Sequence, residues 1–168
     1  MLVLGIDPGI AITGFGIIQT DQNNDYQVKE YGVITTPAGL DEGARLEILY
    51  QKLTDLILLH RPDSSAVEKL FFQKNVRTAI SVGQARGVAM LTLAQAHCPV
   101  AEYTPNEIKQ TVCGYGNAGK AQVQHMVQAL LRLEELPKPD DAADALAVAI
   151  CHIHHQSFSS RVNLAQSS

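Results

Sequence analysis

The sequence predicts a single α/β domain in which helices flank a mixed β-sheet. The chain opens with three short apolar runs separated by turns, a pattern typical of consecutive strands. Helical segments then alternate with two further strand-like runs, which brings the predicted sheet to five strands. The length of 168 residues suits one domain with a proper core.

The first three strands are predicted at Leu2 to Ile6, Ile12 to Thr20 and Tyr26 to Thr35. The Asp7–Gly9 turn separates the first two, and the polar segment Asp21–Asp25 separates the second from the third. Connections this tight predict an antiparallel meander.

The remaining elements follow from apolar spacing, capping residues and prolines. Strands are expected at 65–70 and 100–103, and helices at 41–60, 75–97, from 104 onward, at 120–133 and at 140–155. The small, polar end of the chain predicts a flexible tail at 157–168, so the single domain is expected to span 1–156.

Composition narrows the class of protein. Hydrophobic residues make up 46% and charged residues 18%, and no apolar run is long enough to cross a membrane. The start of the chain lacks the features of a signal peptide. Three widely spaced cysteines, Cys98, Cys113 and Cys151, indicate free thiols and a cytoplasmic location.

The charge is unevenly distributed along the chain. The net charge of -4 argues against a nucleic-acid partner. The segment from Glu68 to Lys120, however, contains six Lys or Arg residues and three acids. The rest of the chain contains seven Lys or Arg residues and fourteen acids. This basic middle segment could be a DNA-contacting face, and an ordinary solvated mixture of charges explains it about as well.

Two carboxylates are predicted at the ends of buried strands. Asp7 directly follows the apolar run LVLGI, and Glu68 lies near the end of the short strand that begins at Ser65. A charge in such a place must be paired, metal-bound or protonated. The alternatives are a turn-capping role for Asp7 and a surface position for Glu68.

Two more carboxylates lie one turn apart at the start of the last helix. Asp141 and Asp144 share a helix face that Val148 and Cys151 continue, which predicts that this face points toward the sheet. Helix capping explains Asp141 well, since acids favour the first turn. Asp144 is harder to explain that way, and its small neighbours would let the helix lie close to the sheet: Ala142, Ala143, Ala145 and Ala147.

The four acids together favour Mg²⁺, or Mn²⁺ in its place, because all the donors are hard oxygens and no His or Cys cluster accompanies them. Two such ions in one site stabilise both the attacking and the leaving oxygen of a phosphoryl displacement. The set therefore predicts metal-dependent phosphodiester hydrolysis.

Five segments in order resemble the RuvC family of bacterial Holliday junction resolvases: LGIDPGIAITGFG, AVEKLFFQKN, SVGQARGVAM, IKQTVCGYGNAGKAQVQHMV and DAADALAVAICH. The resemblance extends to about residue 156. It implies an RNase H-like fold, a homodimer, a Mg²⁺-dependent nuclease that nicks four-way junctions symmetrically, and association with a RuvA–RuvB complex. Its four acidic ligands fall on Asp7, Glu68, Asp141 and Asp144.

The resemblance also implies DNA contacts. Phe71 matches an aromatic residue that inserts near the scissile site, and Lys109 and Lys120 match basic residues beside the active site. An exposed Phe can stack on an unpaired base. A further set of basic residues could contact phosphates, which would position DNA without reading its sequence: Lys74, Arg77 and Arg86.

The predicted helix at 75–97 is apolar on two faces. Ala79, Gly83 and Gly87 form a smooth stripe, and a second face carries Val82, Ala85, Ala89 and Leu93. A helix of this kind needs more than one partner. The family's dimer interface would supply one, and a helix sandwiched within one subunit is the alternative.

Other interpretations are weaker. The segment from Gly114 to Lys120 fits part of a P-loop, but Ala121 replaces the required hydroxyl residue. The Asp7–Gly9 turn resembles the phosphate hairpin of two-domain sugar kinases, for which the chain is too short. The group of His152, His154 and His155 is better explained by a solvated helix end than by a metal site. A related nuclease of ribosomal RNA maturation and a non-cleaving junction-binding protein remain as alternative functions.

Overall fold

The computed structural model describes residues 1–21, 25–69 and 76–166. Five strands form one mixed sheet in the order β3-β2-β1-β4-β5. Their bounds are β1 Leu2–Asp7, β2 Ile12–Thr20, β3 Tyr26–Thr35, β4 Ser64–Glu68 and β5 Val100–Tyr103. The predicted number of strands and the mixed sheet are confirmed.

The strands pair as the connections predict. β1, β2 and β3 form the expected antiparallel meander, while β4 runs parallel to β1 and β5 runs parallel to β4. The parallel pairs bring the carboxyl ends of β1, β4 and β5 to one edge of the sheet. Asp7, at the end of β1, and Glu68, at the end of β4, both lie at that edge.

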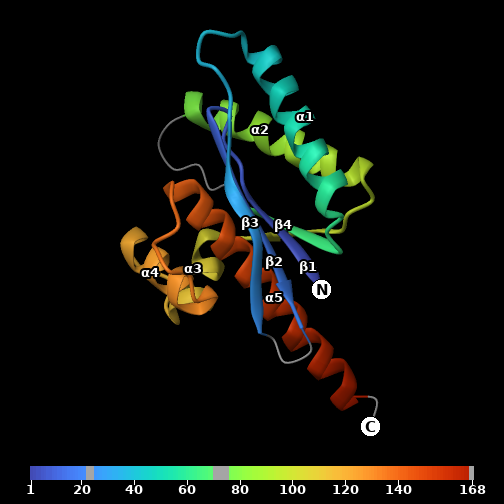
Figure 1. The fold of residues 1–168 in the computed structure, drawn as a ribbon, viewed down its shortest axis with the longest axis vertical. Helices are drawn as coiled ribbons and strands as arrows, with labels where there is room; N and C mark the ends of the chain where they lie inside the picture. Colours follow the sequence, from blue (N-terminus) through green and yellow to red (C-terminus); the bar gives the residue numbers. More distant parts are fainter. Residues whose placement is uncertain (22–24, 70–75, 167–168) are drawn as a thin grey trace.

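Helices cover both faces of the sheet (Figure 1). α1 (Glu42–His60) and α2 (Val76–Gln95) pack together on one face. The other face carries α5 (Asp140–Gln166), with α3 (Pro105–Cys113) and α4 (Lys120–Leu131) packed beside it. Each face has its own hydrophobic core, so the sheet is buried from both sides.

Capping residues fix two of the helix starts. The Asp41 side chain accepts a hydrogen bond from the backbone N–H of Ala44 at the start of α1. At α3, Thr104 and Glu107 form a reciprocal capping box. These are the starts that the sequence predicts for both helices.

α5 lies unusually close to the sheet. A methyl group added at Gly5 would collide with the backbone carbonyl oxygen of Ala145, and one added at Gly14 would collide with that of Asp141. On the helix side, four alanines are fully or almost fully buried, as their small size predicts: Ala142, Ala143, Ala145 and Ala147. Glycine in the strands and alanine in the helix together set the depth at which the acids of α5 meet the sheet.

The last helix is longer than predicted. It was expected to end at His155, and it continues to Gln166. No glycine or proline stands between 156 and 166, and the serines there do not stop a helix that is already formed. No helix within the described ranges is both long and apolar enough to span a membrane.

Candidate active site

Asp7 and Glu68 lie side by side because their strands are parallel neighbours. Ile6 pairs with Val67, so the next residue of each strand is an acid at the same edge. Side chains alternate along a strand. Val3 and Ala66 belong to the core beneath α5, so Asp7 and Glu68, which have the same parity, point toward that helix.

Asp141 and Asp144 approach the same edge from α5. Asp7 pairs with Gly14 on β2, and the Asp141 backbone lies directly over Gly14. Asp144 follows one turn later and lines the same pocket as Glu68. Strand ends and helix start therefore bring the four predicted acids into one neighbourhood.

Mutual repulsion is strong at Asp7. Burial, followed by the charges of Glu68, Asp144 and Asp141, raises the pKa of its carboxyl from 3.8 to about 8. Lys120 opposes this rise without overcoming it. Asp7 and Glu68 also share a hydrogen bond, which needs a proton on one of them because two carboxylates can only accept. The high pKa of Asp7 identifies it as the donor at neutral pH.

The pKa values of Glu68 and Asp144 are raised for similar reasons. Burial and then the Asp144 charge raise the pKa of Glu68, although Asp7, Lys109 and Lys120 lower it. Burial is the largest cause that raises the pKa of Asp144, and the adjacent Lys120 lowers this pKa without cancelling the rise. Ionising all of these carboxyls together is therefore costly unless cations compensate them.

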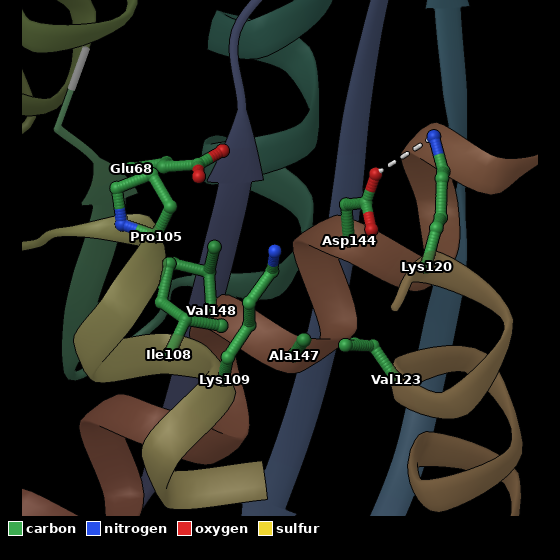
Figure 2. A pocket seen from close by; sticks show the side chains of 9 residues that line it. All are labelled: Glu68, Pro105, Ile108, Lys109, Lys120, Val123, Asp144, Ala147 and Val148. Carbon is green, nitrogen blue, oxygen red and sulfur yellow. Dashed lines mark ion pairs between the residues drawn. The ribbon is translucent and has the colours of Figure 1, made fainter. Parts of the chain in front are cut away.

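A pocket of about 220 Å³ opens beside these acids (Figure 2). Lys109 from α3 and Lys120 from α4 are its cationic members, and Lys120 Nζ lies 3.2 Å from Asp144 Oδ2. Burial alone would lower the pKa of Lys120, but Asp144 and Asp140 together raise it. The remaining lining is mostly apolar: Pro105, Ile108, Val123, Ala147 and Val148.

The four acids lie near one another, but their side chains are not arranged as a complete set of metal ligands. Within residues 1–21, 25–69 and 76–166, no three Asp, Glu, His or Cys side chains meet closely enough to hold a metal ion as they stand. The negative charge is balanced in part by the Lys120 ammonium and by the proton on Asp7.

The predicted DNA-contacting residues fall into three groups. Lys109 and Lys120 line the acidic pocket. Arg86 lies elsewhere: it forms an ion pair with Glu102 on β5. Glu102 pairs with Val67, which belongs to the core beneath α1 and α2, so Arg86 lies on the opposite face of the sheet from the acids. The last group falls outside the described residues or side chains: Phe71, Lys74 and Arg77.

One histidine was placed wrongly by the sequence. His152 was expected at a solvated helix end, and it is only 2% exposed. Its ring nitrogens contact the Tyr103 hydroxyl at 2.9 Å and the Ser64 hydroxyl at 3.0 Å. Burial lowers the pKa of His152. His152 lies on the side of α5 that faces the sheet, whereas His154 and His155 are exposed as expected.

Asp140 is a charged neighbour of the site that the sequence did not single out. Its carboxylate contacts Lys120 and Gln124 on α4. A signal existed in the spacing: Asp140 and Asp144 lie one helical turn apart, as do Lys120 and Gln124. Only the packing of α4 against α5 shows that the two pairs face each other.

The fold defines a class of protein. A five-stranded mixed sheet of this order, covered by helices on both faces and carrying acids at its carboxyl edge, is an RNase H-like domain. The model of the family described as "Crossover junction endodeoxyribonuclease RuvC" matches residues 3–152. The chain belongs to this family.

Individual relatives agree with the family match. The crossover junction endodeoxyribonuclease RuvC of Pelotomaculum thermopropionicum is 52% identical over 164 residues, covering 98% of this chain and 99% of that protein. The Thermus thermophilus RuvC structure has a TM-score of 0.87 at 32% identity, covering 95% of this chain and 97% of that one. A second T. thermophilus RuvC structure, in complex with a Holliday junction substrate, has a TM-score of 0.86 at 30% identity, covering 94% and 96%.

Proposed function

We propose that this chain is a Holliday junction resolving endonuclease of the cytoplasm that introduces paired, symmetric nicks in four-way DNA during recombination and repair. The observation that carries the proposal is the family match over residues 3–152 together with the acidic edge at Asp7, Glu68, Asp141 and Asp144. The comparisons favour it over a nuclease of ribosomal RNA maturation, because the family and its relatives are crossover junction nucleases. A non-cleaving binder is the alternative that the cleavage experiment below tests.

The donor set fits divalent metal ions. All four groups are carboxylates, and burial together with the charges of the neighbouring acids raises the pKa of Asp7 so far that only added positive charge would let all of them ionise at neutral pH. Asp7, Glu68, Asp141 and Asp144 would hold two Mg²⁺ ions, with Mn²⁺ able to substitute. Bound there, the ions would supply an activated water and charge stabilisation for phosphodiester hydrolysis.

The chain's own cations complete the site. Lys109 and Lys120 extend from two different helices into the pocket that Glu68 and Asp144 also line (Figure 2). Ammonium groups in such positions would hold the negatively charged phosphate of the DNA backbone against the acids. The predicted contacts of Phe71, Lys74, Arg77 and Arg86 with DNA stay predictions, and Arg86 gains no support from its place on the opposite face.

A two-fold dimer would suit a junction in which two strands are cut. On α2, Ala85, Ala89 and Leu93 are fully buried in their own core. Among the residues that the structure describes, nothing covers the other face at Gly83 or Gly87, because a methyl group added at either would meet nothing within 4 Å. This favours an open face over a helix sandwiched within one subunit. We propose that the open face pairs with a second copy, and that the dimer works with RuvA and RuvB.

The proposed function predicts junction-selective, metal-dependent cleavage. A synthetic four-way junction should be nicked in Mg²⁺ and left intact in EDTA, and a linear duplex of the same sequence should stay uncut in both. Denaturing gel electrophoresis of end-labelled strands would show the nicks. Equal cleavage of the duplex would indicate a general nuclease, and junction binding without any cleavage would indicate a binder.

DNA affinity should depend steeply on salt. The logarithm of the binding constant should fall with the logarithm of salt concentration with a slope of about -0.9 per phosphate neutralised. Lys109→Met should make that slope shallower by about 1, as measured by fluorescence anisotropy in Ca²⁺. The matched control is Lys52→Met, which alters an exposed lysine on α1, and the slope should not change. A salt-independent affinity would contradict a phosphate-contacting face.

Dimerisation should depend on the open face of α2. Gly87→Glu has room within the subunit and improves helix propensity, so the monomer should stay at least as stable. The same change should weaken the dimer at least about thirtyfold, the size of one interface hot spot of about 2 kcal/mol. Analytical ultracentrifugation would measure this, with Gly39→Glu as the control at another uncrowded glycine. A monomeric wild type at micromolar concentration would refute the dimer.

A further inference from the structure

Four polar side chains join α4 to α5 beside the pocket that Glu68, Asp144, Lys109 and Lys120 line. Lys120 and Gln124 lie one turn apart on α4, and Asp140 and Asp144 lie one turn apart on α5. Lys120 Nζ lies 3.2 Å from Asp144 Oδ2 and 3.4 Å from Asp140 Oδ2. Gln124 Nε2 donates to Asp140 Oδ1 at 2.6 Å. The ammonium therefore has two carboxylate partners, and only one of them lines the pocket.

Asp140 is held in place from its other side. One of its oxygens accepts from Gln124 while the second faces Lys120, so the contact with Gln124 fixes the direction of the carboxylate. The Lys120 side chain is 55% exposed and ends a flexible four-carbon stem, so it has little packing to restrain it. Its position depends on these ionic contacts more than on the core.

The two partners differ in what else they are needed for. Asp144 is one of the four acids proposed as metal ligands, and a carboxylate that shares its charge with a divalent cation attracts an ammonium less. Asp140 does not line the pocket, and its contacts are with α4. The contact between Asp140 and Lys120 can therefore persist while Asp144 binds a metal ion.

We propose that Asp140 is a positioning residue that keeps the Lys120 ammonium beside the pocket lined by Glu68 and Asp144, independently of Asp144. The inference rests on the proposed function for what Lys120 does there, namely to hold the DNA phosphate. Asp140 itself touches no reacting atom. It acts through Lys120, and Gln124 acts through Asp140.

The placement of Lys120 can be measured without DNA or metal. An acetylating reagent modifies an ion-paired lysine more slowly than a free one, and peptide mass spectrometry gives the rate at Lys120. The exposed Lys52 in the same digest is the internal reference. Asp144→Asn removes one partner of Lys120 and leaves the other, Asp140. The acetylation rate of Lys120 in this variant should therefore stay within about twofold of the wild-type rate. Adding Asp140→Asn should raise the rate about two- to fivefold, the range of a partly exposed ion pair.

Asp140→Glu retains the charge and should restore most of the protection, and Asp55→Asn makes the same Asp-to-Asn change at an exposed site on α1 and should alter nothing. If Asp144→Asn alone leaves Lys120 as reactive as the double variant does, Asp140 does not hold Lys120 and the proposal is wrong. This outcome is independent of nuclease activity, which the junction assay tests separately.

A cleavage experiment tests the consequence. In single turnover with saturating Mg²⁺, Asp140→Asn should slow junction cleavage about two- to fivefold when Lys120 is present and should have no effect in a Lys120→Met background. A general charge effect predicts the opposite sign, because removing an acid beside DNA strengthens binding to the phosphates. Equal slowing in both backgrounds would show that Asp140 acts on something other than Lys120.

Discussion

Asp7→Asn should lower the rate of junction cleavage in Mg²⁺ by at least about a thousandfold, equivalent to about 4 kcal/mol of transition-state stabilisation. Asn has the shape of Asp but cannot supply the anionic oxygen that a divalent cation needs. Asp7 is the better site for this test than Asp144, because Asp144 also pairs with Lys120 and its loss would disturb two features at once. Single-turnover kinetics on a labelled four-way junction would give the rate.

Binding must be measured beside cleavage. Junction affinity of Asp7→Asn in EDTA should be no weaker than that of wild type, because without metal the Asp7 carboxyl keeps its proton near neutral pH and the change removes little negative charge. Asp55→Asn is the matched control, since it makes the same chemical change at an exposed position on α1 and should leave both measurements unchanged. Cleavage by Asp7→Asn at a rate near that of wild type would overturn the proposed metal site.

The sequence predicted the parts of the site that depend on local pattern. An acid directly after a buried run ends a strand, and two such strands that lie parallel must present their acids at one edge, as Asp7 and Glu68 do. The run of alanines around Asp144 predicted a helix that lies close to the sheet. What the pattern could not give is the matching set of glycines, Gly5 and Gly14, beneath that helix.

The surroundings of some polar residues depend on contacts between distant segments, which the sequence alone does not show. Arg86 belongs to the basic middle of the chain by sequence, yet its partner Glu102 places it on the far face of the sheet. His152 belongs to a polar cluster by sequence, yet Tyr103 and Ser64 satisfy it in the core. In both cases a polar residue is explained by a partner that only the tertiary fold supplies.

Crowding of the acids predicts that the protein without metal loses stability as the pH rises. In the unfolded chain the Asp7 carboxyl ionises near its ordinary pKa of 3.8, whereas in the fold that pKa is about 8. The folded state therefore keeps a proton that the unfolded state has released. The stability that this proton represents is fully present below about pH 4 and is lost as the pH rises through about 8.

The size of the loss is large for one group. A rise in pKa from 3.8 to about 8 corresponds to about 6 kcal/mol in the free energy of unfolding. The upward shifts at Glu68 and Asp144 have the same sign and add to the trend. Urea unfolding in EDTA, followed by circular dichroism between pH 5 and pH 9, would measure it.

Asp7→Asn isolates the contribution of that one carboxyl, since Asn cannot ionise and every other titrating group is common to both proteins. The variant should match wild type near pH 5 and become more stable than wild type by several kcal/mol at pH 9. Mg²⁺ should restore the stability of wild type at high pH by binding only the folded state, and should do much less for the variant. A residue that destabilises the empty fold while enabling cleavage is what a metal ligand should be, because the charge repulsion that it causes is relieved only when the cations bind. If Asp7→Asn instead proves less stable than wild type at pH 9 in EDTA, then the Asp7 carboxylate is satisfied by the protein alone and does not await a metal.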